Sequence, residues 1–225
     1  MKFIPILFST PMVQAILAGR KTMTRRIVKP QPTINEIGNV NFSFKKHGGI
    51  NVPIEDLNKP FIGILDDCPY GQLGDVLWVR ETWCYMDASP NNCAYKEDFG
   101  SEPVSWNWKP SIYMSKEVCR LFLKVKSIKV ERLQDITEED AIAEGVQDAS
   151  CTDHTTCPSS LCKDGCSAKG TYYNYPTDFD GEPCYSAVES FEQLWQSING
   201  EKSWDANPWV WVIKFERIEK PENFK

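Results

Sequence analysis

The sequence predicts an α+β fold, a β-barrel with short peripheral helices and two loop insertions. The 225 residues are enough for one domain with a substantial core. Predicted strands outnumber predicted helices, and these helices are too short for a doubly wound parallel sheet. The loop-like segment 84–110 and the Cys-, Ser-, Thr-, Asp- and Gly-rich segment 147–186 are expected to be insertions. Weak periodicity marks 33–60 as a further irregular, inserted stretch. We therefore expect a single domain over 1–225.

The N-terminal elements follow from their local sequence. Ile4–Phe8 is short and apolar, which is typical of a buried strand. Thr10 is the expected N-cap of a helix with Pro11 in its first turn. Gly19 is expected to end that helix, because glycine readily adopts the left-handed conformation. The segment 20–28 is rich in threonine and basic residues and is expected to be extended.

The remaining elements are predicted by propensity, capping and periodicity. The β-branched and aromatic residues of 76–83 indicate a strand, and Thr137 begins a capping signature that opens a helix over 138–144. Alternating apolar residues from Trp209 to Phe215 predict a half-buried last strand. The other predicted elements are strands over 61–65 and 120–132 and a helix over 187–198.

The composition excludes several classes of protein. A formal net charge of -6 excludes a surface that binds nucleic acid electrostatically all over, although it permits a local basic patch. The hydrophobic fraction of 41% excludes an intrinsically disordered chain. No apolar run reaches the roughly 20 residues of a membrane span, and Met1–Phe8 lacks the cleavage site of a signal peptide. We expect a cytoplasmic protein that does not bind membranes; its oligomeric state is left open.

The segment after the first helix carries the first candidate site. Lys21 is surrounded by other cations, which lower the pKa of a lysine amine and allow it to act as a base. The alternative is an edge strand with solubilising charge. In a flat strand Lys21 and Thr24 would point to opposite faces. They can share a site if Lys21 belongs to the turn that leaves the helix.

Glu144 is a second candidate, because it stands at the C-terminal end of a predicted helix. A carboxylate is electrostatically unfavourable there. Residues that break a local rule of this kind are candidates for a functional role. A solvated surface glutamate is the alternative.

Three segments resemble the ASCH domain family, small β-barrels of the PUA-like superfamily. They are Ile16–Arg26, Gly74–Glu81 and Leu133–Gly145. Three further segments, Trp78–Trp83, Trp108–Met114 and Asn207–Val212, are similar to the longer ASCH proteins of bacteriophages and prophages. The resemblance spans nearly the whole chain apart from the insertions.

The resemblance implies an enzyme that removes the acyl group from N(4)-acetylcytidine without a catalytic cofactor. The family's lysine, threonine and glutamate match Lys21, Thr24 and Glu144. Thr24 would attack the acyl carbonyl, Lys21 would accept its proton, and Glu144 would orient the cytosine or pass a proton to its amino group. Arg26 would stabilise the oxyanion or contact ribose or phosphate. The substrate would be a nucleoside or an RNA.

The alternative is a PUA-like module that binds RNA or a modified base without chemistry, or a ribonuclease. Trp83, with Trp106, Trp108, Tyr113 and Trp204, offers stacking surfaces for a base, although tryptophans are also common core residues. Arg80 and Glu81 form either a structural ion pair or a base-reading pair. We count Arg80, Glu81 and Trp83 among the candidate substrate-binding residues.

A cysteine cluster indicates a structural metal site. Four thiols and one imidazole lie within 16 residues, at Cys151, His154, Cys157, Cys162 and Cys166. Zinc binds four such ligands tetrahedrally, so four of these residues could hold a structural zinc ion in the polar loop. A flexible insertion with free thiols is the alternative interpretation.

Overall fold

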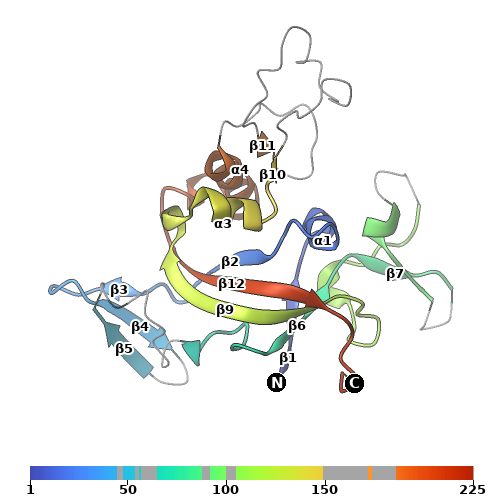
Figure 1. Ribbon diagram of the computed structural model, residues 1–225, viewed down its shortest axis with the longest axis horizontal. Coiled ribbons are helices and arrows are strands. Elements are labelled where there is room, and N and C mark those ends of the chain that lie inside the picture. Colours follow the sequence, from blue (N-terminus) through green and yellow to red (C-terminus); the bar gives the residue numbers. More distant parts are fainter. Residues whose placement is uncertain are drawn as a thin grey trace, which may run out of the picture.

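The computed structural model describes residues 1–44, 48–53, 56, 65–87, 92–99, 105–148, 172–173 and 186–224. Within them the protein is a mixed α+β structure built on one five-stranded sheet, drawn in Figure 1. Its strand order is β1 (Phe3–Leu7), β6 (Val76–Arg80), β9 (Phe122–Arg132), β12 (Trp209–Ile218) and β2 (Met23–Ile27). The β1–β6 pair is parallel, and the other three pairs are antiparallel.

The predicted closed barrel is not found in the described residues. The hydrogen-bonded strand order begins at β1 and ends at β2, and no ladder joins these two edges there. A side chain spans the opening instead, since an Arg26 Nη donates to the carbonyl of Leu7 at 2.7 Å. The sheet is nevertheless strongly bent, as the long curved β9 and β12 show in Figure 1.

The sheet is accompanied by the α-helices α1 (Thr10–Leu17), α3 (Glu138–Ala143) and α4 (Ala187–Asn199). The predicted cap of α3 is confirmed, because the Thr137 side chain accepts a hydrogen bond from the backbone N–H of Asp140. The predicted cap of α1 is wrong by one residue. Ser9 is its N-cap and makes no capping hydrogen bond with its side chain.

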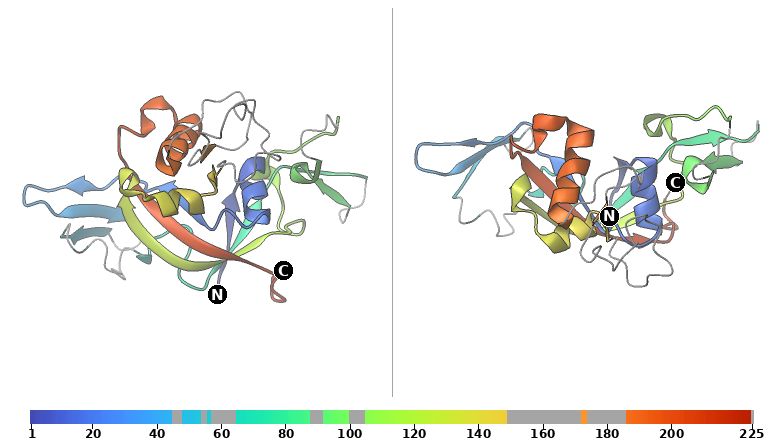
Figure 2. Two further views of the ribbon diagram at one scale, coloured as in Figure 1. Left: turned by 45° about the horizontal axis from the view of Figure 1, so that its top comes forward. Right: turned by 90° about the horizontal axis from the view of Figure 1, so that it is seen from above.

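The last strand is buried on both faces at its start, not half-buried. Trp209, Trp211, Ile213 and Phe215 pack in the main core with residues of α1, as the alternation predicts. Val210 and Val212 on the other face are fully buried too. They pack against residues of α3 and α4, which lie side by side over this face in Figures 1 and 2. The helices come from distant parts of the sequence, so the strand's own pattern does not predict their cover.

The segment 33–60, predicted to be irregular, contains a three-stranded antiparallel sheet. Its strands are β3 (Thr33–Ile34), β4 (Val40–Phe44) and β5 (Gly48–Val52). Val40, Phe42 and Val52 are buried in the main core, and this burial stabilises the extended conformation. Phe42 packs edge-on against Trp209 with ring centroids 6.2 Å apart.

The segment 84–110 also contains regular structure. β7 (Trp83–Tyr85) and β8 (Cys93–Tyr95) form an antiparallel hairpin, followed by the 3-10 helix η2 (Lys96–Phe99). The predicted strand 76–83 therefore divides between β6 and β7. Most of the predicted strand 61–65 lies outside the described residues. The other short elements are η3 (Ser111–Tyr113), η4 (Leu133–Asp135), η5 (Glu201–Ser203), β10 (Gln147–Asp148) and β11 (Tyr172–Tyr173).

None of the helices in the described residues is both long enough and apolar enough to cross a membrane.

Candidate functional site

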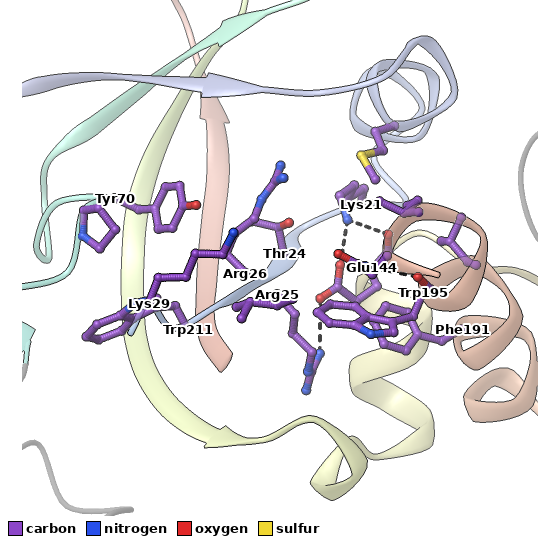
Figure 3. Close-up of a pocket in the computed structure, with 16 residues that line it drawn as sticks. Lys21, Thr24, Arg25, Arg26, Lys29, Tyr70, Glu144, Phe191, Trp195 and Trp211 are labelled. Carbon is purple, nitrogen blue, oxygen red and sulfur yellow. Dashed lines mark hydrogen bonds and ion pairs between the residues drawn. The ribbon is translucent and has the colours of Figure 1, made fainter. Parts of the chain in front are cut away.

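A cavity of about 340 Å³ lies among α1, β2 and α4. Lys21, Thr24, Arg26 and Glu144, four of the residues predicted to form the site, all line it. Figure 3 shows them converging from the turn after α1, from β2 and from the end of α3. Lys21 and Glu144, 123 positions apart in the sequence, thus share one pocket.

The end of α1 explains how Lys21 and Thr24 reach the same pocket. Gly19 follows the helix with φ 74°, a left-handed conformation that suits glycine. The chain then folds back, and the backbone N–H of Lys21 donates to the carbonyl of Ala15 at 2.9 Å. Lys21 therefore belongs to the turn and precedes β2, which begins at Met23. Lys21 and Thr24 can therefore share a site, as the sequence analysis required.

Glu144 is the C-cap of α3 and directly contacts Lys21. The Lys21 Nζ lies 2.7 Å from Glu144 Oε2 and donates a second hydrogen bond of 2.8 Å to the Glu144 carbonyl. This amine therefore satisfies one of the free carbonyls at the end of α3. The backbone also fixes the contact, because the N–H of Thr22 donates to the carbonyl of Ala143 at 2.9 Å. The alternative of a solvated surface glutamate is wrong, since Glu144 is only 3% exposed.

Burial changes the acid–base behaviour of Lys21. Desolvation lowers the pKa of the Lys21 amine below its ordinary value, although the charge of Glu144 opposes this shift. The neighbouring cations Arg26 and Arg25 lower it further. A lysine with a lowered pKa loses its proton at a lower pH, which is what a general base requires.

Arg25 holds the other side of the Glu144 carboxylate. Its Nη1 lies 3.3 Å from Glu144 Oε1, and its Nη2 lies 2.6 Å from Glu131 and 2.8 Å from Asp140. The Arg25 side chain is fully buried. Burial alone would lower its pKa, but the charges of Glu144 and Glu131 raise it, so Arg25 stays protonated. Glu144 is therefore fixed between two cations.

The far side of the pocket contains residues that sequence reasoning missed. Lys29, Tyr70 and Trp211 line it, and Figure 3 draws them on the other side of Thr24 from the Lys21–Glu144 pair. Lys29 comes directly after the basic segment 20–28, which is the one sequence signal for it. Trp211 lies among the alternating apolar residues that predict the last strand, and no sequence signal marks Tyr70.

Helix α4 forms the wall beside Glu144. Phe191 and Trp195 are buried and also line the pocket. Ile198 lies on the predicted apolar face of α4 but is 55% exposed, because it stands at the pocket and not in the core. One helix face thus serves both the core and the cavity.

The other predicted substrate-binding residues lie outside the lining of this pocket. Glu81 is buried and contacts the guanidinium of Arg120 at 2.9 and 3.0 Å. Trp83 is 2% exposed and packs edge-on against Tyr85. Arg80 donates to the carbonyl of Ile112. The predicted Arg80–Glu81 ion pair is not found in the described residues, because Glu81 pairs with Arg120 and Arg80 donates to a backbone carbonyl. Trp83 is a core residue, which is the alternative given for the tryptophans.

The remaining aromatic candidates are divided between core and surface. Trp204 is buried against Phe191 of α4, with ring centroids 6.4 Å apart. Trp106 and Trp108 are half-buried with centroids 5.7 Å apart, away from the pocket lining. Tyr113 is 70% exposed.

The cysteine cluster Cys151, His154, Cys157, Cys162 and Cys166 lies outside the described residues. Among the residues that the structure describes, no group of three or more His, Cys, Asp or Glu side chains is placed to hold a metal ion. The zinc site stays a prediction.

No protein-family model, no curated protein and no solved structure matches this chain.

Proposed function

We propose that the protein is an amidohydrolase that removes the acyl group from N(4)-acylated cytidines. One observation carries the proposal: Lys21, Thr24 and Glu144 line one pocket, with the amine of Lys21 in contact with the carboxylate of Glu144. These are the three residues that the resemblance to ASCH enzymes selects. We also propose that the bent five-stranded sheet has the PUA-like fold of this family, with its barrel open between β1 and β2.

In the proposed reaction the Thr24 hydroxyl attacks the acyl carbonyl, and the neutral amine of Lys21 accepts its proton. The tetrahedral intermediate then breaks its C–N bond. The exocyclic nitrogen takes up a proton, delivered by Lys21 directly or through Glu144, and cytidine leaves. Water, deprotonated by Lys21, attacks the remaining threonyl ester. The carboxylic acid departs, and the Thr24 hydroxyl is restored.

The surroundings of Lys21 favour this role. Glu144 takes one hydrogen bond from the amine and fixes its direction. Arg25 contacts the other oxygen of Glu144 and restrains that carboxylate. Arg26, in the same strand as Thr24, adds to the pocket a cation that can contact the ribose or phosphate of a substrate.

Aromatic side chains supply the apolar surface that a nucleobase needs. Phe191 and Trp195 lie beside Glu144, and Tyr70 and Trp211 lie beyond Thr24. Rings of this kind bind bases by stacking. A cavity of about 340 Å³ lies within the usual range for small-ligand sites.

The test is an assay of a panel of N(4)-acylcytidines without added metal, in which chromatography measures the release of cytidine. Thr24→Val should abolish turnover because it removes the hydroxyl and keeps the shape of the side chain. Thr22→Val is the matched control, since Thr22 is exposed and outside the pocket lining. Binding of the acylcytidines without any turnover would refute the enzyme and favour the binding module.

We also propose the cytoplasm as its location, because the buried Cys68, Cys84 and Cys119 are free thiols.

A further inference from the structure

We infer that the cytidine substrate carries a phosphate at its 5′ end, and that Arg26 and Lys29 bind that phosphate. The inference rests on the proposed function, because it assigns the two ends of the substrate to the two ends of the same pocket. It narrows the substrate class from nucleosides to nucleotides, either free or at the end of an RNA.

The pocket has a reactive end and a cationic end. Lys21 and Glu144 form the reactive end, and Thr24 stands between them and the far side. Lys29 lies at that far side, just beyond the end of β2. In a cytidine the N(4) acyl group and the 5′ carbon are at opposite ends of the molecule. We place the acyl carbon at Thr24 and the base against Tyr70 and Trp211, so that the 5′ end extends toward Lys29.

The charges of this pocket are unbalanced. Its lining contains four basic side chains, Lys21, Arg25, Arg26 and Lys29, and one acidic side chain, Glu144. Glu144 is already engaged by Lys21 and Arg25. The excess of positive charge is local, because the whole chain has a formal net charge of -6. Such a patch attracts an anionic ligand.

Arg25 and Arg26 show the difference between a structural and an available cation. Arg25 contacts three carboxylates, Glu131, Asp140 and Glu144. Within the described part of the chain, Arg26 forms no ion pair and donates to the Leu7 carbonyl. Lys29 likewise has no carboxylate partner among those residues and is exposed at the pocket. A phosphate can accept hydrogen bonds from both.

The surface between the two ends suits the rest of a nucleotide. Tyr70 and Trp211 line the pocket beside Lys29, so a ribose or a base edge would lie against rings before the phosphate reaches the cations. Ligand sites commonly combine an apolar wall with a few charged groups that fix orientation.

The experiment compares kcat/KM for N(4)-acetylcytidine, its 5′-monophosphate, and a short RNA with N(4)-acetylcytidine at its 5′-phosphorylated end. We expect the monophosphate to exceed the nucleoside by about tenfold or more, the effect of one hydrogen bond to a charged group. Lys29→Gln should reduce that ratio about tenfold. Lys124→Gln, at an exposed lysine of β9 outside the pocket lining, should leave the ratio unchanged. Preference for the RNA over the monophosphate would identify RNA as the source of the phosphate.

Equal kcat/KM values for nucleoside and monophosphate would overturn the inference and leave the amidohydrolase intact. If none of the substrates is hydrolysed, the proposed function is refuted. The phosphate inference is then tested by binding of cytidine and cytidine 5′-monophosphate. Calorimetry should show tighter binding of cytidine 5′-monophosphate than of cytidine, with a preference that weakens from about 50 mM to about 500 mM salt and is lost in Lys29→Gln. Equal affinities would overturn it.

Discussion

Replacing Arg25 by methionine should strongly destabilise the fold. The Arg25 side chain is fully buried and contacts Glu131 at 2.6 Å, Asp140 at 2.8 Å and Glu144 at 3.3 Å. Methionine fills a similar volume but removes the charge. Three carboxylates with side chains at most 13% exposed would then lose their common cation.

The expected loss in free energy of unfolding is about 3 kcal/mol. Removing one partner from a buried ion pair typically costs about 3–5 kcal/mol. The lower end applies because each carboxylate keeps a lysine: Lys129 lies 2.5 Å from Glu131, Lys214 lies 3.6 Å from Asp140, and Lys21 lies 2.7 Å from Glu144. The site is therefore not left without positive charge.

Urea denaturation near neutral pH measures this loss. Lys126→Met is the control, because the Lys126–Glu216 pair is 3.1 Å long but its side chains are 53% and 47% exposed. Such surface pairs contribute about 0–1 kcal/mol. A loss below about 1 kcal/mol for Arg25→Met would show that the network contributes no more than a surface pair, and would refute the reasoning.

The difference in free energy of unfolding between wild type and Arg25→Met should also shrink in acid. Burial raises the pKa of Asp140, but hydrogen bonding to Arg25 and its charge outweigh this and hold the pKa below its ordinary value. A depressed carboxyl pKa stabilises the fold above the unfolded value of about 3.9. That contribution is lost as the pH falls through the pKa of Asp140 in the folded protein. A constant difference from about pH 7 to about pH 3 would contradict this linkage.

Three further predictions concern the reaction and the metal. The kcat/KM for deacylation should rise with pH and level off below the ordinary lysine value of 10.5, because burial lowers the pKa of Lys21; Lys21→Arg should remove the activity, since arginine does not deprotonate. Glu144→Gln should lower kcat by about 10²-fold or more in protein that circular dichroism shows to be folded, because Glu144 takes part in proton transfer in the proposed reaction. Elemental analysis should find zinc in the purified protein, and Cys157→Ser together with Cys162→Ser should remove it; metal-free wild type would leave the flexible-loop alternative.

The sequence by itself determined the helix ends and turns, because the residues that form them have strong local preferences. The helix opened by Thr137 forms as predicted because its cap lies within the segment itself. Gly19 ends α1 because that position needs the left-handed conformation. Capping and turn preferences depend on a few adjacent residues, so they can be read without the rest of the chain.

Only the tertiary structure decided what depends on distant partners. Val212 is buried because α3 and α4 cover it, and β4 is a strand because Phe42 enters the main core. Lys21 and Glu144 were each ambiguous in sequence, and their contact of 2.7 Å exists because the turn after α1 lies against the end of α3. Lys29 and Tyr70 become pocket residues for the same reason. Burial and charge pairing are properties of three-dimensional neighbourhoods, and one strand or helix does not contain them.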